Sequence, residues 1–198
     1  MSMCLFGGTF DPPHNAHFII AEAIRESLAL ERIIFVPALA PPHKRDQSRV
    51  TDIEHRLAML RLCIADNPAF AISDIEIQRG GISYTIETVR EVKASYGLDR
   101  NDLHLLIGSD SLADFKTWYR WERILAECRV IVARRPRFEQ NSIDTDLLSQ
   151  VHFLNLPRIE ISSTEIRQRY QDGRMTRFYV PAPVDRYIRE HGLYEVSA

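Results

Sequence analysis

The chain has 198 residues, of which 45% are hydrophobic and 26% are charged, the composition of an ordinary packed globular domain. Lys and Arg total 25 against 27 Asp and Glu, a formal net charge of −2, which excludes extended nucleic-acid binding through many phosphate contacts. An anionic ligand would therefore have to be held by charges that are placed locally.

Three cysteines, Cys4, Cys63 and Cys128, lie far apart and lack the C-x-x-C spacing of zinc and redox sites, so we expect reduced core thiols. The first residues carry no basic and apolar leader, and no apolar run reaches the roughly 18 residues of a membrane span. We expect a cytoplasmic protein that binds neither nucleic acid nor membrane.

Short apolar runs alternate with segments of helical period along the whole chain. In chain order, strands are predicted at 4–6, 33–36, 70–77, 103–107, 129–133 and 151–156. Helices are predicted between them, at 15–29, 51–65, 84–96, 118–126, 162–172 and 184–191. The helix at 51–65 opens with a predicted capping box of Thr51 and Glu54. The stretches 37–50 and 136–149 show little pattern.

This alternation predicts an α/β fold: a doubly wound, Rossmann-like, mostly parallel sheet with helices on both faces and a short C-terminal helical region. We expect one domain over residues 1–198. Ligands of such folds bind at the carboxyl ends of the strands, so the loops that follow the strands are the places to search.

The first such loop, Gly7–His17, reads G-G-T-F-D-P-P-H-N-A-H and lacks the G-x-G-x-x-G fingerprint, which disfavours a nicotinamide-dependent dehydrogenase. Its glycines let the backbone approach an anion closely. The apolar stripe of the next helix puts His17 on the sheet-facing side, one turn after His14. The two histidines fit three interpretations: hydrogen-bonded loop residues, an incomplete metal site with Asp11, or donors to a phosphate.

A second candidate, Ile161–Arg167, reads I-S-S-T-E-I-R and begins the helix predicted at 162–172. Its Ser and Glu three apart fit a capping box, and its two isoleucines fit a hydrophobic staple, so helix formation accounts for part of the segment. The hydroxyls of Ser163 and Thr164 and the cation of Arg167 are left over, beside a helix N-terminus that attracts phosphate.

Together these segments resemble the signatures of the nucleotidyltransferase superfamily with an H-x-G-H motif, and specifically those of bacterial nicotinate-nucleotide adenylyltransferases. They stand about 145 residues apart and in the order of that family. The second signature, I-S-S-T-x-I-R, matches in full. The family usually has Gly in place of Ala16, so this chain is expected to put a methyl group under the adenine.

The resemblance extends over nearly the whole chain. Lys44, in the sequence P-P-H-K, resembles a lysine that approaches phosphate in the family, although a solvated loop is the alternative. Gly108 and Asp110 resemble the G-x-D segment that meets the ATP ribose.

Other matching segments concern the acceptor. Tyr84 and Thr85 stand where the acceptor pocket of the family begins, and Trp118-Tyr119 resembles the pair that binds the pyridine ring, with a core tryptophan as the alternative. Arg134-Arg135 ends a predicted strand, where arginines suit phosphate, although one of them could pair with a surface carboxylate instead.

The resemblance implies transfer of the adenylyl group of ATP to nicotinate mononucleotide, with nicotinate adenine dinucleotide (deamido-NAD) and pyrophosphate as products and Mg²⁺ carried by ATP. The expected catalytic residues are His14, His17, Lys44 and Arg167. The expected ATP-binding residues are Gly7, Gly8, Thr9, Phe10, Gly108, Asp110, Ile161, Ser162, Ser163, Thr164 and Arg167. The expected nicotinate-nucleotide-binding residues are Lys44, Tyr84, Thr85, Trp118, Tyr119 and Arg134.

Several alternatives stay open at the level of sequence. Another enzyme of the superfamily would use nicotinamide mononucleotide or phosphopantetheine as acceptor, or would be a cytidylyltransferase. An ATP-sensing module without turnover and a metal hydrolase built on the two histidines belong to other classes. The choice between nicotinate mononucleotide and nicotinamide mononucleotide depends on the directions of hydrogen-bond donors, which a sequence does not show. A homo-oligomer is also compatible with the sequence.

Overall fold

A computed structural model describes residues 1–39, 50–134 and 143–195. The strands are β1 (Met3–Gly8), β2 (Arg32–Pro37), β3 (Phe70–Ile72), β4 (Leu103–Gly108), β5 (Arg129–Ala133) and β6 (Val151–Leu154). The helices are α1 (Asn15–Ser27), α2 (Ile53–Ile64), α3 (Ile75–Arg79), α4 (Thr85–Tyr96), α5 (Ser109–Ala113), the 3-10 helix η2 (Phe115–Thr117), α6 (Trp121–Glu127), α7 (Thr145–Gln150), α8 (Ser163–Gln171) and α9 (Ala182–Glu190). Within these ranges no helix is both long enough and apolar enough to cross a membrane.

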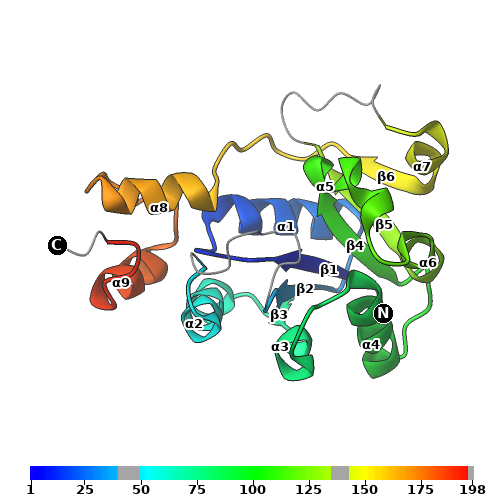
Figure 1. Cartoon of the computed structure of the whole chain (residues 1–198), viewed down its shortest axis with the longest axis horizontal. Coiled ribbons are helices and arrows are strands. Elements are labelled where there is room, and N and C mark those ends of the chain that lie inside the picture. The colour runs from blue at the N-terminus through cyan, green and yellow to red at the C-terminus, as the bar shows by residue number, and fades with distance from the viewer. Residues whose placement is uncertain (40–49, 135–142, 196–198) are drawn as a thin grey trace.

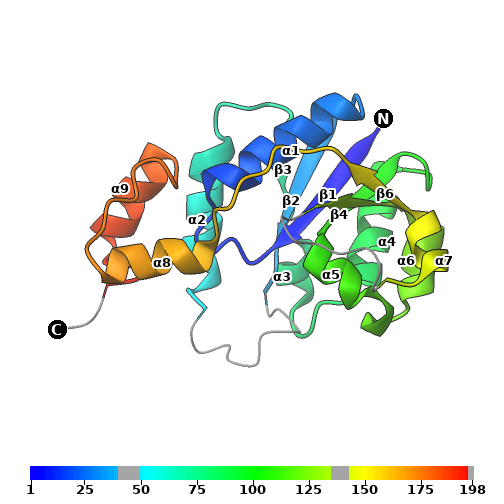
Figure 2. The same ribbon diagram turned by 90° about the horizontal axis from the view of Figure 1, so that it is seen from above.

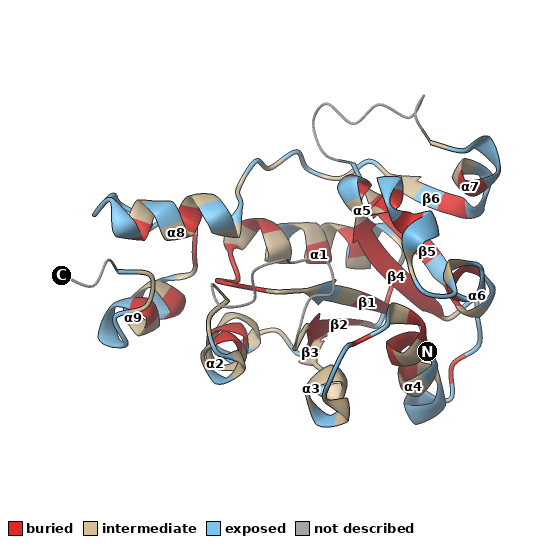
Figure 3. Ribbon diagram, viewed as in Figure 1, coloured by how far each residue is buried: buried red, intermediate tan, exposed pale blue. Residues whose placement is uncertain are grey.

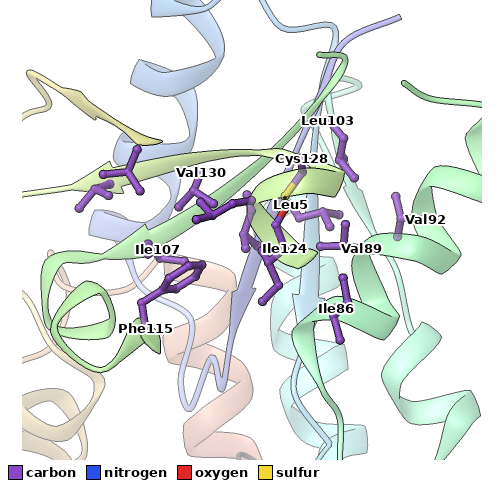
Figure 4. Close-up of a cluster of buried hydrophobic side chains, with 14 of the residues drawn as sticks. Leu5, Ile86, Val89, Val92, Leu103, Ile107, Phe115, Ile124, Cys128 and Val130 are labelled. Atoms are coloured by element: carbon purple, nitrogen blue, oxygen red, sulfur yellow. Dashed lines mark hydrogen bonds between the residues drawn. The ribbon is translucent and has the colours of Figure 1, made fainter. Parts of the chain in front are cut away.

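The strands form one parallel sheet in the order β3-β2-β1-β4-β5-β6, with helices on both faces (Figure 1). Neighbouring residues of a strand face opposite cores. Leu5 shares a core with Val89 of α4 and Ile124 of α6 (Figure 4), whereas Cys4 shares the other core with Ile24 of α1. Burial on both faces explains the continuous apolar strands, which are buried along most of their length (Figure 3). The predicted doubly wound α/β fold is confirmed.

Strand β1 occupies the centre of the sheet and pairs with β2 on one edge and β4 on the other. The chain leaves β1 toward β2 and leaves β4 toward β5, so the loops after β1 and β4 diverge. A crevice results at the carboxyl ends of these two strands, where doubly wound folds bind their ligands. The strands end there in Gly7-Gly8 and in Gly108.

The C-terminal helices form a third, smaller core. Met59 of α2 packs with Ile166 of α8 and with Val184 and Ile188 of α9. Figures 1 and 2 place α8 and α9 together at one end of the molecule, opposite α6 and α7. The short C-terminal helical region predicted from the sequence is confirmed.

Three local predictions were wrong. The strand predicted at 70–77 ends at Ile72, because the backbone carbonyl of Asp74 accepts from Ile77 and Gln78 and starts α3. Glu54 and Thr51 form no capping box, since the Thr51 N–H donates to another element and Asp52 becomes the N-cap of α2. Helix α7 begins inside the stretch 136–149, which was predicted to have little pattern.

The cysteine thiols of Cys4, Cys63 and Cys128 are free. Burial raises the pKa of all three thiols, that of Cys128 to about 12. Thiolates are therefore disfavoured at neutral pH, and these cysteines behave as apolar packing residues. The prediction of core cysteines is confirmed for Cys4 and Cys128, while Cys63 is partly buried.

A buried histidine predicts a pH dependence of stability. The Nδ1 atom of His104 on β4 lies 3.3 Å from the carbonyl oxygen of Met3, and burial lowers the pKa of the imidazole. The unfolded chain therefore takes up the proton more readily, so the contribution of His104 is present above about pH 6.5 and is lost as the pH falls through the lower folded-state pKa.

We expect the free energy of unfolding of the wild type to fall more steeply between about pH 7.5 and pH 5 than that of His104→Asn, whose amide can donate but does not titrate. Urea denaturation across this range measures the difference. If the free energy of unfolding changed with pH in the same way in both proteins, His104 would not be the source of the pH dependence.

Candidate active site

The carboxyl ends of β1 and β4 open into two adjoining cavities. The α4 cavity, of about 540 Å³, is bounded by Ser83, Thr85 and Trp118. The α8 cavity, of about 700 Å³, is bounded by His14 and by the first turn of α8. Both include residues 7–9 and Gly108 in their walls, and both volumes are in the range of small-molecule sites. The two cavities therefore meet at the glycine pair that ends β1.

The two histidines are stacked at the start of α1. His14 is the N-cap of α1, and its ring centroid lies 3.6 Å from that of His17. The backbone N–H of His14 donates to Nδ1 of His17 over 3.1 Å, so neutral His17 carries its ring proton on Nε2. The ring of His17 also meets the edges of Phe6 and Phe10 at centroid distances of 5.8 and 5.1 Å. His17 thus faces the sheet, as predicted, and both rings line the α8 cavity.

Phe10 fixes the turn of the first loop. Its backbone φ is 50°, which few bulky residues adopt, and its ring is only 2% exposed. The ring packs directly beneath Gly8, where a Cβ atom would lie 2.9 Å from Cζ of Phe10. Gly8 is therefore required by close packing, and the buried ring holds the loop against Phe35 of β2.

The segment Ile161–Arg167 docks on the same loop from the other side of the α8 cavity. The Ser163 hydroxyl donates to the carbonyl of Pro12 over 2.9 Å, and Arg167 donates to the carbonyl of Asp11 over 2.7 Å. Ser162 caps α8 by accepting from the Glu165 N–H over 3.1 Å, which confirms its predicted capping role. This segment thus caps helix α8 and also lines the α8 cavity.

The α4 cavity combines aromatic faces with hydrogen-bond donors. Tyr84 is the N-cap of α4, and its ring lies 4.6 Å from that of Tyr119. Trp118 packs on Phe115, with a centroid distance of 5.2 Å, and also lines the cavity, so its position is compatible with both the core and the ligand interpretation. Ser83 is 6% exposed, and its hydroxyl makes no hydrogen bond of ordinary length with the described residues. It does interact with the carboxyl group of Glu76, whose pKa it helps to lower. The wall of the cavity therefore includes the Ser83 hydroxyl, the Glu76 carboxyl and the N-terminus of α4.

Comparisons with known proteins agree with this arrangement. A family described as cytidylyltransferase-like matches residues 5–169. A protein of Thermoanaerobacter sp. (strain X514) named probable nicotinate-nucleotide adenylyltransferase is 39% identical over 96% of this chain and 93% of its own length. Its namesake in Exiguobacterium sibiricum is 41% identical over 98% of this chain and 99% of its own length.

The chain belongs to the nicotinate-nucleotide adenylyltransferase family. Two solved structures of nicotinic acid mononucleotide adenylyltransferase from Plasmodium falciparum share the fold. The complex with NaAD gives a TM-score of 0.79 at 22% identity, covering 98% of this chain and 97% of that one. The complex with APC gives 0.77 at 21% identity, covering 98% and 96%.

The two cavities divide most of the residues that the sequence assigned to two substrates, although residues 7–9 and Gly108 line both cavities. Every predicted ATP-binding residue lines the α8 cavity: Gly7, Gly8, Thr9, Phe10, Gly108, Asp110, Ile161, Ser162, Ser163, Thr164 and Arg167. Ala16 is buried and lines it too. The α4 cavity brings together four of the predicted nicotinate-nucleotide residues: Tyr84, Thr85, Trp118 and Tyr119.

Of the basic residues Lys44, Arg134 and Arg135, the structure describes only Arg134. Arg134, expected on the nicotinate-nucleotide side, lines the α8 cavity, and its guanidinium lies 4.9 Å from the centroid of the Phe153 ring. Lys44 and Arg135 lie outside the described residues.

The sequence did not single out Glu76, which lines the α4 cavity. Burial raises the pKa of its carboxyl group, against the effect of a 2.8 Å hydrogen bond from the Thr88 hydroxyl. The predicted strand at 70–77 hid this residue, because the helical turn of α3 brings Glu76 to the cavity. No motif in the sequence marked it.

Arg56 of α2 was also missed. It is 2% exposed, and its guanidinium donates to the carbonyls of Thr51, Thr9 and Ala38 over 2.8, 2.9 and 2.8 Å. The sequence did carry a signal, because Arg56 stands on the same helix face as the apolar Met59. An arginine on an inward helix face is rarely buried unless it is paired.

A metal site formed by the two histidines and Asp11 is one of the interpretations that the sequence leaves open. The Asp11 carboxylate accepts instead from the Tyr194 hydroxyl over 2.7 Å and from the Thr51 N–H over 3.3 Å. Across the described part of the chain, no group of three or more His, Cys, Asp or Glu is placed to hold a metal ion.

The close packing at Gly8 predicts a contrast between the two glycines. Gly8→Ala is expected to lower the free energy of unfolding by about 1–3 kcal/mol, because the buried Phe10 ring cannot move aside easily. Gly7→Ala meets no atom within 4 Å and should change it by less than about 1 kcal/mol. Urea denaturation of both variants checks this, and equal losses would refute the packing argument.

Proposed function

We propose that the protein transfers the adenylyl group of ATP to nicotinate mononucleotide, giving nicotinate adenine dinucleotide and pyrophosphate as a step of NAD biosynthesis. The observation that carries the proposal is that two cavities meet at one glycine-rich loop, residues 7–9. A reaction between two nucleotides requires both phosphates at one point, with each nucleotide extending away from it. The names of the relatives support the same reaction. The proposal treats residues 1–198 as one domain, since β1 and α8 build one site.

The α8 cavity is proposed for ATP. Backbone N–H groups in the first turn of α8, together with the Ser163 and Thr164 hydroxyls and Arg167, are suited to the phosphates. Gly108 and Asp110 are proposed for the ribose. A Cβ atom at Gly7 would meet no protein atom within 4 Å, and the space left by the missing side chain is proposed for close approach of ATP to the backbone.

The α4 cavity is proposed for the acceptor. The pyridine ring would lie against Trp118 and Tyr119, and its carboxylate would accept from the Ser83 hydroxyl and from backbone N–H groups at the start of α4. A helix N-terminus favours an anion over a neutral amide. We therefore expect nicotinate mononucleotide to be preferred over nicotinamide mononucleotide.

The proposed chemistry is an in-line displacement. An oxygen of the 5′-phosphate of nicotinate mononucleotide forms a bond to the α-phosphorus of ATP, and the bond from that phosphorus to the α–β bridging oxygen breaks, releasing pyrophosphate. A phosphate dianion needs no general base, so catalysis rests on holding two anions together and stabilising the charge on the α-phosphoryl oxygens. His14 and His17 are proposed as donors to those oxygens, with Lys44 and Arg167 neutralising phosphate charge.

Mg²⁺ is proposed to arrive with ATP. The described residues of the α8 cavity offer imidazoles, hydroxyls, Arg167 and the carboxylates of Asp110 and Glu160, while the Asp11 carboxylate is held by other elements. Among the described residues, no three His, Cys, Asp or Glu side chains are grouped to hold a metal ion. This donor set fits a cation held chiefly by phosphate oxygens and water rather than by a protein cage. When bound, the cation would neutralise charge on the phosphates.

The direct test is pyrophosphate release with Mg-ATP and a panel of acceptors: nicotinate mononucleotide, nicotinamide mononucleotide, phosphopantetheine and glycerol phosphate. We expect the largest kcat/KM with nicotinate mononucleotide. Release with neither mononucleotide would refute the proposal. ATP binding without release for any acceptor would instead favour a nucleotide-sensing module.

The histidine assignment predicts that His17→Ala lowers kcat by about 10²–10³, the usual effect of losing one preorganised donor. His152→Ala is the control, because this histidine is exposed on β6 and lies in neither cavity wall. Steady-state kinetics and circular dichroism of both variants give the comparison. A His17→Ala enzyme with wild-type turnover would contradict the assignment.

A further inference from the structure

A buried charged cluster lies beneath the first loop. Asp11 is 1% exposed, yet it carries a carboxylate, and such groups are rarely buried unless they are paired. One carboxylate oxygen accepts from the hydroxyl of Tyr194, 183 residues away in sequence, and the other accepts from the N–H of Thr51, 40 residues away. The loop that carries His14 is therefore anchored by parts of the chain far from it.

Arg56 supplies the positive charge of this cluster. Its guanidinium joins the loop after β1 at Thr9, the loop after β2 at Ala38 and the start of α2 at Thr51. Burial lowers the pKa of Arg56, and the nearby Asp11 carboxylate opposes that effect. The two opposite charges compensate each other where water is largely excluded.

Tyr194 reaches the cluster from the segment that follows α9. Its backbone φ is 66°, in the left-handed region that a bulky side chain seldom adopts. Such a conformation persists where the surrounding contacts determine it. Here the contacts are the hydrogen bond to Asp11 and the packing of the ring on Tyr170, at a centroid distance of 6.0 Å.

We propose that Tyr194 is a positioning residue for the adenylyl transfer, acting through Asp11 on the loop that presents Thr9, Phe10 and His14 to the α-phosphate. This inference rests on the proposed function, because it concerns the geometry of that reaction. Without the hydroxyl the buried carboxylate loses its shortest hydrogen bond, and the loop loses its fixed orientation. Small displacements of groups that orient reacting phosphates reduce turnover more than they reduce binding of the distant acceptor ring.

The test compares two tyrosines whose hydroxyls are equally engaged. Tyr194 donates to Asp11 over 2.7 Å, while Tyr170 donates to Asp185 over 2.6 Å, away from both cavities. Tyr194→Phe is expected to lower kcat by about 10- to 100-fold, with little change in KM for nicotinate mononucleotide. Tyr170→Phe keeps the ring that packs on Tyr194 and removes only the hydroxyl that donates to Asp185. This variant is therefore expected to lose thermal stability but to keep kcat within about two-fold.

Amide hydrogen exchange at residues 8–11 and at His14, measured on the same proteins without substrates, gives a second readout. Faster exchange is expected in Tyr194→Phe and wild-type exchange in Tyr170→Phe. Unchanged exchange in Tyr194→Phe, or the same kcat in both variants, would overturn the proposal. If the wild type releases no pyrophosphate, the proposed function fails. The exchange rates of Tyr194→Phe still show whether Tyr194 holds the loop, because faster exchange supports that role and unaltered exchange overturns it.

Discussion

The pairing of β1 on both of its edges determines the rest of the structure. Because β2 and β4 both lie parallel to β1, the three strands end at one edge of the sheet, and their following loops diverge. The backbone at Gly7-Gly8 is thereby placed at the wall between two cavities rather than at the side of one. Helices α1, α4 and α8 each add a wall to the cavities at this point.

The charged groups that the proposed site uses lie at the two cavities and beneath the first loop. A net charge of −2 gives no general attraction for nucleotides, so binding depends on local groups. Two helix N-termini, those of α4 and α8, open onto the two cavities, and Arg167 lies beside one of them. Arg56 is buried beneath the loop instead, where it bonds to carbonyl oxygens and organises the backbone. Cations thus have two separate tasks, contact with phosphate and support of the loop.

The sequence predicted the sheet and the two signature segments well, because their information is local. Glycines, a histidine spacing and a serine cap each constrain only a few neighbouring residues, and the structure confirms that Ile161–Arg167 meets the first loop. The predictions failed where a distant partner decided the outcome. The N–H of Thr51 bonds to Asp11 instead of joining a capping box, and Glu76 reaches its cavity through a helical turn that an alternating pattern concealed.

By itself, the sequence determined the fold class, the family signatures and many of the residues that line the two cavities, since periodicity and short motifs specify elements and their ends. Only the tertiary structure decided which residues share a cavity, where Arg134 lies and what holds the first loop in place. The reason is that the Asp11, Arg56 and Tyr194 cluster joins positions up to 183 residues apart. Hydrogen bonds between such distant residues depend on how the elements pack, so they cannot be predicted from a local sequence pattern.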